Sequence, residues 1–382
     1  MIAATLIRRL PERSHDRLRR RPLLYTTYAQ DMSLLNSGPK RLWTAIFLGL
    51  LLLAPLALTG DLENRVALVA ATAIGAIGIN LVTGYAGQVS LGHAFFLGIG
   101  AYTAAWLGGN PDGSTYGLGL DIWIWLPAAG LVSAMFGVLV APIATRLRGL
   151  YLAIVTLGLV FIGEHIFRDW RSLTGGVGTG RAGPRATLLG ARLDVDGPWV
   201  GIEWSRELRL YYLSIAVLVL MGIAARNIAR SRIGRSFTAV RDRDVAAELM
   251  GVSLSRTKAL AFALSSFYAG VAGALLVTIT SFVEPTSFNL LASIEYLAMI
   301  IIGGLATISG AIIGAAFIVL VPRLLESLVP GLPILGELFS PTEIQVMLNG
   351  LLIVAFVVLE PRGIVGLWVR VRNYWKGYPF SY

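Results

Sequence analysis

The chain has 382 residues, of which 55% are hydrophobic and only 14% are charged, and its formal net charge is +10. A soluble globular domain carries about 25% charged residues, so this composition excludes a soluble fold and indicates a protein embedded in lipid. Cysteine is absent, which excludes disulfides, thiol catalysis and cysteine metal sites. The three histidines are far apart in sequence and predict no metal site.

The first 41 residues form a basic arm in which nine Lys and Arg outnumber three Asp and Glu. A signal peptide would place its apolar core within the first 15–30 residues or so, whereas the first long apolar run begins near Leu42. We therefore expect residues 1–41 to form a cytoplasmic arm and not a signal peptide.

Ten apolar runs follow, and each is about long enough to cross a bilayer, which takes ~20 residues. The region 293–328 is too long for one span, and Ser309–Gly310 offers a break. The runs predict an all-α polytopic membrane protein, a bundle of about ten transmembrane helices within a membrane domain at 42–359. They lie at 42–59, 65–83, 90–108, 122–144, 149–167, 209–228, 259–282, 293–308, 309–328 and 343–359.

The basic residues predict the sidedness of the loops, because Lys and Arg collect on the cytoplasmic side of a membrane. The arm, the turn 145–148, the loop 226–258 and the tail 360–382 together hold 23 of the 32 Lys and Arg but only 7 acidic residues. We expect these segments, and thus both termini, to face the cytoplasm of a bacterial inner (plasma) membrane. Contact with anionic lipid accounts for this basic character better than nucleic-acid binding does.

The longest outer loop spans about 168–208 and is rich in Gly and Pro. Its segment Gly178–Gly183 matches GxGxxG, but a nucleotide site needs that motif between a strand and a helix of a βαβ unit. Here the motif follows a membrane span on the outer side. We therefore expect a flexible loop, with a short strand near 192–195, and no nucleotide site.

Glycine is abundant, with 43 residues, and it clusters inside the spans. Because glycine lets helix backbones approach closely, these clusters predict a tight bundle. Two charge-free stretches, 80–93 and 298–314, are interrupted by Gly and predict broken or re-entrant segments, with an inverted repeat around a transport path as one arrangement. The glycines assigned to packing or hinges are Gly84, Gly87, Gly303, Gly304, Gly310 and Gly314.

Several polar side chains lie in or beside these apolar runs, where ionisable groups usually face a bundle interior or a wet cavity. We expect all of them except Asn80 to line a translocation path. Glu295 has an alternative role near the outer interface, bonded to a neighbouring helix end. The residues are Asn80, Gln88, Ser90, His93, Glu295 and Tyr296.

A charged insert at 241–262 separates two apolar runs and predicts two short helices. Asp244 can cap the first helix, Gly251 suits the left-handed residue that ends it, and Ser253 or Ser255 can cap the second. An apolar face follows from the spacing of Val245, Leu249 and Val252, with Arg241, Arg243 and Arg256 beside it. Such a helix could lie on lipid or dock into a groove of a partner protein.

Five motifs in order give the chain a family resemblance. They are NLVTGYAGQVSLGHAFF (80–96), RGLYLAIVTLG (148–158), MGVSLSRTKALAF (250–262), SIEYLAMIIIGGLAT (293–307) and EPRGIVG (360–366). From about residue 65 to 366 the chain resembles LivM-type permease subunits of branched-chain amino-acid ABC transporters. Residues 248–251, GluLeuMetGly, also resemble the EAA-type loop of ABC importers, without the Ile-x-Leu-Pro element that ends that loop elsewhere.

The resemblance implies a division of labour among subunits. A LivH-like second permease would help to enclose the path, and two ATPase subunits would bind ATP and Mg. An extracytoplasmic substrate-binding protein would deliver the solute near loop 168–208. This chain would be no enzyme and hold no cofactor, and its coupling loop, 229–258, would dock on an ATPase. The coupling residues implied are Arg241, Asp244, Glu248, Leu249, Met250, Gly251 and Arg256.

Other functions remain open on the sequence. The same permease architecture resembles transporters of urea, short amides and aromatic acids. A secondary transporter or channel would move its solute without ATP. A membrane enzyme is disfavoured, because the sequence has no HExxH motif and no acid pair at helical spacing.

Overall fold

The computed structural model describes residues 38–56, 59–111, 116–147, 149–188, 190–199, 202–328 and 363–377, with 347, 350, 351, 354 and 358. It forms two units, Met1–Leu58 and Thr59–Tyr382. Within the first unit, the helix α3 (Gly38–Leu53) continues into the short 3-10 turn η2 (Ala54–Leu56). Most of the arm predicted at 1–41 and most of the span predicted at 343–359 lie outside the described residues.

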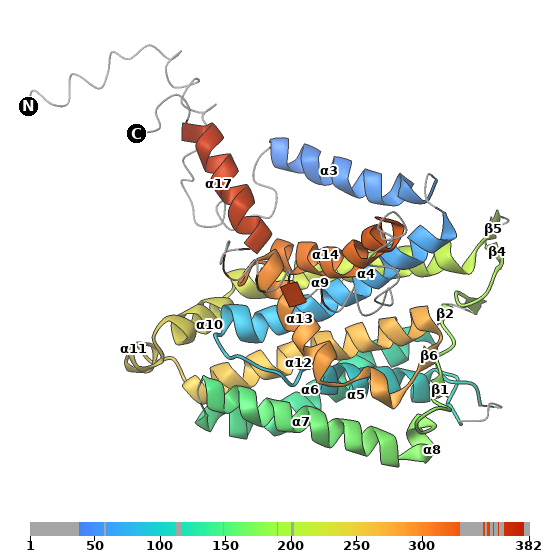
Figure 1. Ribbon diagram of the computed structural model, residues 1–382, viewed down its shortest axis with the longest axis horizontal. Coiled ribbons are helices and arrows are strands. Elements are labelled where there is room, and N and C mark those ends of the chain that lie inside the picture. Colours follow the sequence, from blue (N-terminus) through green and yellow to red (C-terminus); the bar gives the residue numbers. More distant parts are fainter. Residues whose placement is uncertain are drawn as a thin grey trace, which may run out of the picture. The chain divides into compact units, whose positions relative to one another are not determined.

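The second unit is a helical bundle (Figure 1). Its long helices follow the predicted apolar runs, and shorter helices connect them. The helices are α4 (Gly60–Ile79), α5 (His93–Leu107), α6 (Ile122–Arg146), α7 (Leu150–Asp169), α8 (Arg171–Thr174), α9 (Arg206–Arg230), α10 (Arg232–Asp242), α11 (Asp244–Leu249), α12 (Leu254–Thr280), α13 (Leu290–Gly303), α14 (Ile308–Leu328) and α17 (Gly363–Gly377).

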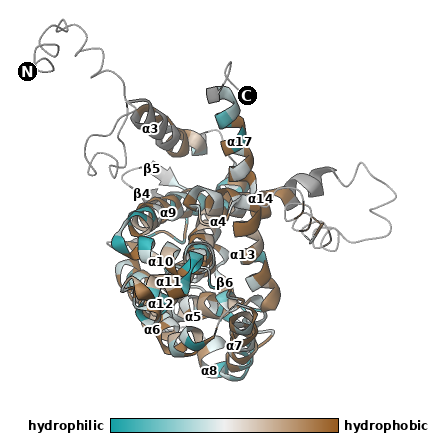
Figure 2. Ribbon diagram, turned by 90° about the vertical axis from the view of Figure 1, so that its left-hand side faces the viewer, coloured by the Kyte–Doolittle hydropathy of each residue, from teal (hydrophilic) through white to brown (hydrophobic). Residues whose placement is uncertain are grey.

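Six helical segments in the described part of the chain are long and apolar enough to cross a membrane. The helix α5 and the stretch Ile308–Val321 of α14 are shorter apolar segments. This confirms the prediction of an all-α polytopic membrane protein. Two of these helices, α5 and α13, differ from simple spans. The helix α5 begins only at His93, after a non-helical stretch, and α13 crosses the bundle at a steep angle to α4 and α12 (Figures 1 and 2).

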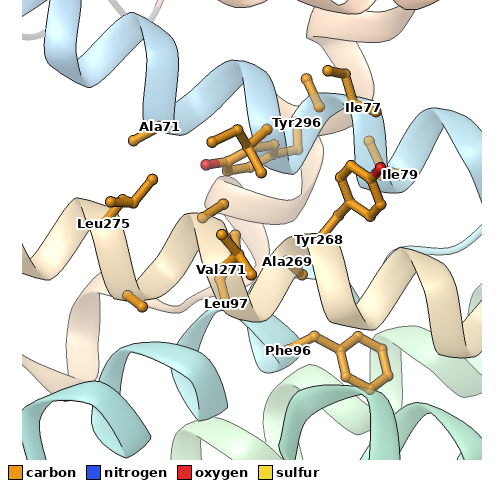
Figure 3. Packing of buried hydrophobic residues seen from close by; sticks show 14 of the residues in the cluster. Ala71, Ile77, Ile79, Phe96, Leu97, Tyr268, Ala269, Val271, Leu275 and Tyr296 are labelled. Atoms are coloured by element: carbon orange, nitrogen blue, oxygen red, sulfur yellow. The ribbon is translucent and has the colours of Figure 1, made fainter. Parts of the chain in front are cut away.

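The helix α12 lies at the centre of the bundle, packed against α4, α5 and α6. Its small residues explain this position, because a Cβ on Gly100 of α5 would collide with the backbone of Gly270, and one on Gly273 would collide with the backbone of Leu97. Figure 3 shows the core between α4 and α12, where Val271 and Leu275 pack beside Tyr296. Such close backbone contact holds membrane helices together by dispersion forces.

Both predicted breaks exist, but one is displaced. The helix α4 continues as a π-helical segment, η3 (Asn80–Tyr85), before the chain leaves helical geometry. The break between α13 and α14 lies at residues 304–307 and not at the predicted Ser309–Gly310. Gly304 and Ala306 have positive φ angles, 131° and 56°, and turn the chain there. Gly310 instead lies inside α14 and faces Gly303, where a Cβ would collide.

The segment between α8 and α9 forms short antiparallel pairs. The strand β2 (Thr187–Leu188) pairs with β3 (Ala191–Arg192), and β4 (Gly197–Trp199) pairs with β5 (Ile202–Trp204). The strand β1 (Arg181–Ala182) pairs with β6 (Phe282–Val283), which precedes the 3-10 turn η4 (Pro285–Ser287). Only Arg192 of the strand predicted at 192–195 is in a strand. The GxGxxG residues lie in a turn and in β1, with no helix after them, so they do not form a nucleotide-binding motif.

Candidate functional site

The two broken helices meet at one side chain. Asn80, the first residue of η3, donates from Nδ2 to the carbonyl of Thr307 at 2.8 Å and accepts from the backbone N–H of Ala306 at 2.9 Å. The amide of Asn80 thus satisfies a donor and an acceptor of the 304–307 turn. Ala306 has a left-handed backbone, which costs a non-glycine residue roughly 1–2 kcal/mol, and the paired hydrogen bonds hold it there.

Gly84 lies one helical turn beyond Asn80 and fits closely against the same turn. A Cβ at Gly84 would lie 2.6 Å from the backbone nitrogen of Ala306 and would collide with the Asn80 side chain. Only glycine leaves room for this contact. The structure thus identifies Ala306 and Asn80 as the residues against which Gly84 packs. Gly303 and Gly314 also face each other across the α13–α14 contact, since a Cβ on Gly314 would lie 3.1 Å from the Gly303 nitrogen.

The non-helical stretch that leads into α5 is held by neighbouring helices. The N–H of Leu91 donates to Oγ1 of Thr156 in α7 at 2.9 Å, and the N–H of Ala94 donates to Oγ of Ser293 in α13 at 2.9 Å. A helix begins with N–H groups that lack partners inside the helix. Two distant hydroxyl groups therefore fix where the chain runs and where α5 starts.

Two of the predicted path residues meet inside the bundle. The rings of His93 and Tyr296 lie 5.0 Å apart, and both residues are buried. Tyr296 passes over α4 at Gly75, where a Cβ would come within 2.5 Å of its ring. Among the described residues, Nε2 of His93 has no hydrogen-bond partner, so a polar atom remains available at this depth.

The other predicted path residues are dispersed. Glu295 is half-buried on α13, beside Tyr296 in sequence, and Ser90 accepts a hydrogen bond from the N–H of Gly92 at 3.3 Å. Gln88 is buried at the inner edge of a separate cavity. The five residues predicted to line a path thus separate into three positions: the His93–Tyr296 pair in the core with Glu295 next to it, Ser90 at the turn before α5, and Gln88 at the cavity.

The cavity has a volume of about 240 Å³. Four stretches of the chain surround it: residues 86–88, the start of α7, the end of α10 with the start of α11, and the first turns of α12. These stretches lie at the end of the bundle that carries α10 and α11, while the strands lie at the other end (Figure 1). The polar residues of its wall are Gln88, Arg241, Asp242, Arg243, Asp244 and Lys258.

The charged insert forms the helix α11 and the turn into α12, and Figure 2 shows hydrophilic residues on α10 and α11. Gly251 has φ of +86°, the left-handed geometry that the sequence predicts. The prediction that Asp244 accepts from a first-turn N–H of α11 is confirmed, but Asp244 is not the cap residue. Arg243 occupies the cap position because its backbone is extended, whereas Asp244 is the first helical residue and accepts from the N–H of Val245 at 2.8 Å.

The tip of the insert exposes apolar side chains. Leu249 is 83% exposed and Met250 is 85% exposed, and Val245 is exposed beside them. Ala247 on the opposite side is buried. Glu248 and Arg256 are exposed as well. Of the residues predicted to couple to a partner, Leu249 and Met250 therefore present an open apolar surface. Glu248 and Arg256 add exposed charges beside it, and Asp244 lines the cavity.

The side chain of Arg241 is 37% exposed, and its guanidinium reaches the end of η3. Its NH1 donates to the carbonyl of Gly84 at 3.1 Å, and its Nε pairs with Asp242 at 3.1 Å. Gly87 has φ of +67°, and a Cβ there would come within 2.6 Å of the Arg241 side chain. The end of α10 is therefore in contact with the end of η3.

Some residues that shape the site carry no local sequence signal. Arg181 is buried at the opposite end and donates to the carbonyls of Ala105, Leu173 and Tyr116. Burial lowers the pKa of its guanidinium. From the sequence, a basic residue in a loop is expected to be solvent-exposed. The three carbonyls that surround Arg181 are brought together only by the fold. No three His, Asp or Glu side chains in the described ranges are placed to hold a metal ion.

Comparison with known proteins gives one family. Residues 62–357 match the family model described as the permease component of the branched-chain amino acid transport system. The chain is 32% identical over 301 residues to the LivM permease proteins of Salmonella typhimurium and of Escherichia coli, an alignment that covers 76% of this chain and 66% of each relative.

The LivH permease protein of Escherichia coli is 26% identical over 314 residues, which cover 79% of this chain and 94% of that protein. No solved structure matches the chain significantly. The family model covers most of the chain, including both broken helices, the cavity and the exposed insert. The chain therefore belongs to the family of branched-chain amino acid transport system permease components.

Proposed function

We propose that this chain is a permease subunit of an ABC importer that passes branched-chain amino acids across the bacterial inner membrane. The observation that supports this most strongly is the exposed apolar tip of α11, at the end of a bundle that belongs to this permease family. Leucine, isoleucine and valine are the expected solutes, because the relatives that cover most of this chain are named for them.

A second permease completes the path in this proposal. The chain is similar to both LivM and LivH proteins, which are named as permeases of the same transport system. We infer that a LivH-like subunit packs beside this chain. Substrate would pass between them near the polar group of His93, Tyr296 and Glu295, where α13 crosses the bundle. Such intramembrane polar groups usually face a path and not lipid.

Two ATPase subunits supply the energy and bind ATP and Mg, so the chain itself catalyses no reaction. The short helix α11 presents Leu249 and Met250 outward, which suits docking into a groove of a protein partner. The basic residues near α11 support its place on the cytoplasmic side. Both termini lie on that side in the proposed topology.

An extracytoplasmic binding protein would meet the opposite end. There Arg181, Arg206 and Arg209 donate to backbone carbonyls of the strand-bearing segment and of neighbouring helices. These bonds give the segment a defined surface. Selection of the solute would begin at this surface and continue at the polar group within the bundle.

The coupling role of α11 is tested by Leu249→Asp. A carboxylate at the apolar tip would have to be desolvated in a groove, so we expect ATPase subunits to be lost when the chain is purified from native membranes in mild detergent. Mass analysis would identify the partners. Val177→Asp, at an exposed apolar residue of the other end, is the matched control and should keep them. Normal retention of the ATPase by Leu249→Asp would contradict docking through α11.

A further inference from the structure

The π segment η3 lies between the insert and the α13–α14 turn and contacts both. Arg241 bonds to Gly84 on one side, and Asn80 bonds to Ala306 and Thr307 on the other. Gly84 and Asn80 are four residues apart, a single helical turn. Three hydrogen bonds and one turn of helix therefore connect the cytoplasmic insert to the turn between two membrane helices.

The first bond joins a cationic side chain to a carbonyl at a helix end. The last carbonyls of a helix have no partner inside the helix, and a cation near a helix C-terminus is favoured by the aligned peptide dipoles. Gly84 lies in the final turn of η3, and the guanidinium of Arg241 takes its carbonyl. Asp242 fixes the guanidinium through Nε. Hydrogen bonds with one charged partner are roughly twice as strong as neutral ones in a buried setting, and solvent weakens that advantage here because the Arg241 side chain is 37% exposed.

Room for movement surrounds this contact. The cavity of about 240 Å³ lies between residues 241–244 and Lys258 of the insert on one side and residues 86–88 and the start of α7 on the other. Arg241 is one of the wall residues, and Gly87 permits its close approach. A push on the insert would therefore act on η3 through Arg241 more directly than through the rest of the cavity wall.

The second bond ends on a strained element. Ala306 holds a left-handed backbone, φ 56°, supported by the Asn80 amide. Strained residues persist only where the surrounding structure holds them, and they often mark elements that switch. Movement of η3 would pull on this support and so on the orientation of α13, which carries Glu295 and Tyr296.

We propose that Arg241 and Asn80 are positioning residues that transmit movement of the cytoplasmic insert to both broken helices and thereby to the polar group on α13. The inference rests on the proposed function, because it takes ATPase closure as the source of the movement. Neither side chain needs to touch solute or ATP. Both act through the backbone that they hold.

The test is the amount of amino acid moved per ATP hydrolysed by the full complex in proteoliposomes. Arg241→Ala should lower this ratio by about fivefold or more, the lower range of coupling between sites, while ATP hydrolysis continues. Arg241→Lys, which keeps a cationic donor, should restore much of the ratio. Arg232→Ala removes the same charge from an exposed position of the same helix and should leave the ratio unchanged. A normal ratio for Arg241→Ala would overturn the proposal.

A distance measurement tests the linkage even if Arg241→Ala assembles poorly. The chain has no native cysteine, so spin labels can be placed at Ile233→Cys on α10 and Leu305→Cys in the turn. With Arg241 and Asn80 intact, nucleotide binding to the complex should change this distance far less than the distance from Ile233 to Val177→Cys at the other end. A large change between Ile233 and Leu305 would contradict the linkage.

The two hypotheses fail in different ways. If the proposed function is wrong, the unmodified complex shows no ATP-driven uptake, which overturns both. If only the linkage is wrong, the unmodified complex transports normally and Arg241→Ala transports with the same ratio.

Discussion

At the residue scale, the bundle depends on glycines that remove a single Cβ at a helix contact. Gly100 lies against the backbone of Gly270, and Gly273 lies against the backbone of Leu97. In lipid the hydrophobic effect does not drive helices together, so close van der Waals contact of this kind supplies much of the attraction between them. One added methyl group at such a contact should therefore matter more than its size suggests.

Gly100→Ala should destabilise the chain, because its methyl group would overlap the Gly270 backbone and force α5 away from α12. Overpacking of this kind costs about 1–3 kcal/mol. Thermal unfolding of the purified chain in detergent measures the loss. Gly158→Ala on α7 is the control, since its Cβ meets nothing within 4 Å. Equal melting temperatures for the two variants would contradict this account of the packing.

Residue types alone identified the polar positions but not their partners. The sequence places Asn80, Gln88 and His93 near one another, and the structure gives them three separate environments. The bonds from Asn80 cross more than 220 residues of chain. No local pattern contains that information, since the pairing depends on how α4 and α13 pack.

At the element scale, hydropathy located the spans because about 20 apolar residues are needed to cross a bilayer. The same argument failed at the α13–α14 break. Ser309 and Gly310 have the composition of a turn, yet Gly310 is used for contact with Gly303, and the chain turns at Gly304 and Ala306. Helix α10 also went unpredicted, although Ser231 caps it and Phe237 and Val240 form its buried face.

The strand-bearing segment depends on a buried arginine, so Arg181→Met should loosen it. Three backbone carbonyls, those of Ala105, Leu173 and Tyr116, would lose their donor, and each buried unsatisfied group costs about 1–3 kcal/mol. Limited proteolysis from the outer side should cut between α8 and α9 faster than in the unmodified chain. Arg171→Met, at an exposed position nearby, should not change the cleavage rate. Unchanged cleavage of Arg181→Met would show that the segment is held by other contacts.

At the scale of the whole molecule, the two ends of the bundle differ in kind. One end gathers the insert, the cavity, Leu147 and Gly149, and the other gathers the strands and the buried Arg181. The sequence predicts loops that alternate between the cytoplasm and the outside. That prediction assigns the same segments to each end of the bundle. Hydropathy and charge predict which loops lie at the same end, because each span carries the chain from one side of the membrane to the other. They do not predict which residues contact each other within an end.

The proposed orientation predicts opposite labelling of two single cysteines. Arg243→Cys in the insert should react with an impermeant reagent only from the cytoplasmic side, and Val177→Cys only from outside. Both positions are exposed, and the chain contains no other cysteine. Inside-out and right-side-out vesicles give the two measurements. Reaction of both residues from the same side would contradict the topology.

The most direct test of the account is uptake of radiolabelled leucine by proteoliposomes that contain this chain with its co-purified subunits and a binding protein from the same cells. The proposal predicts uptake that requires ATP on the side of the insert and stops when ATP is replaced by a non-hydrolysable analogue. Uptake at the same rate without ATP, by a chain that purifies alone, would make the protein a secondary transporter and contradict the account.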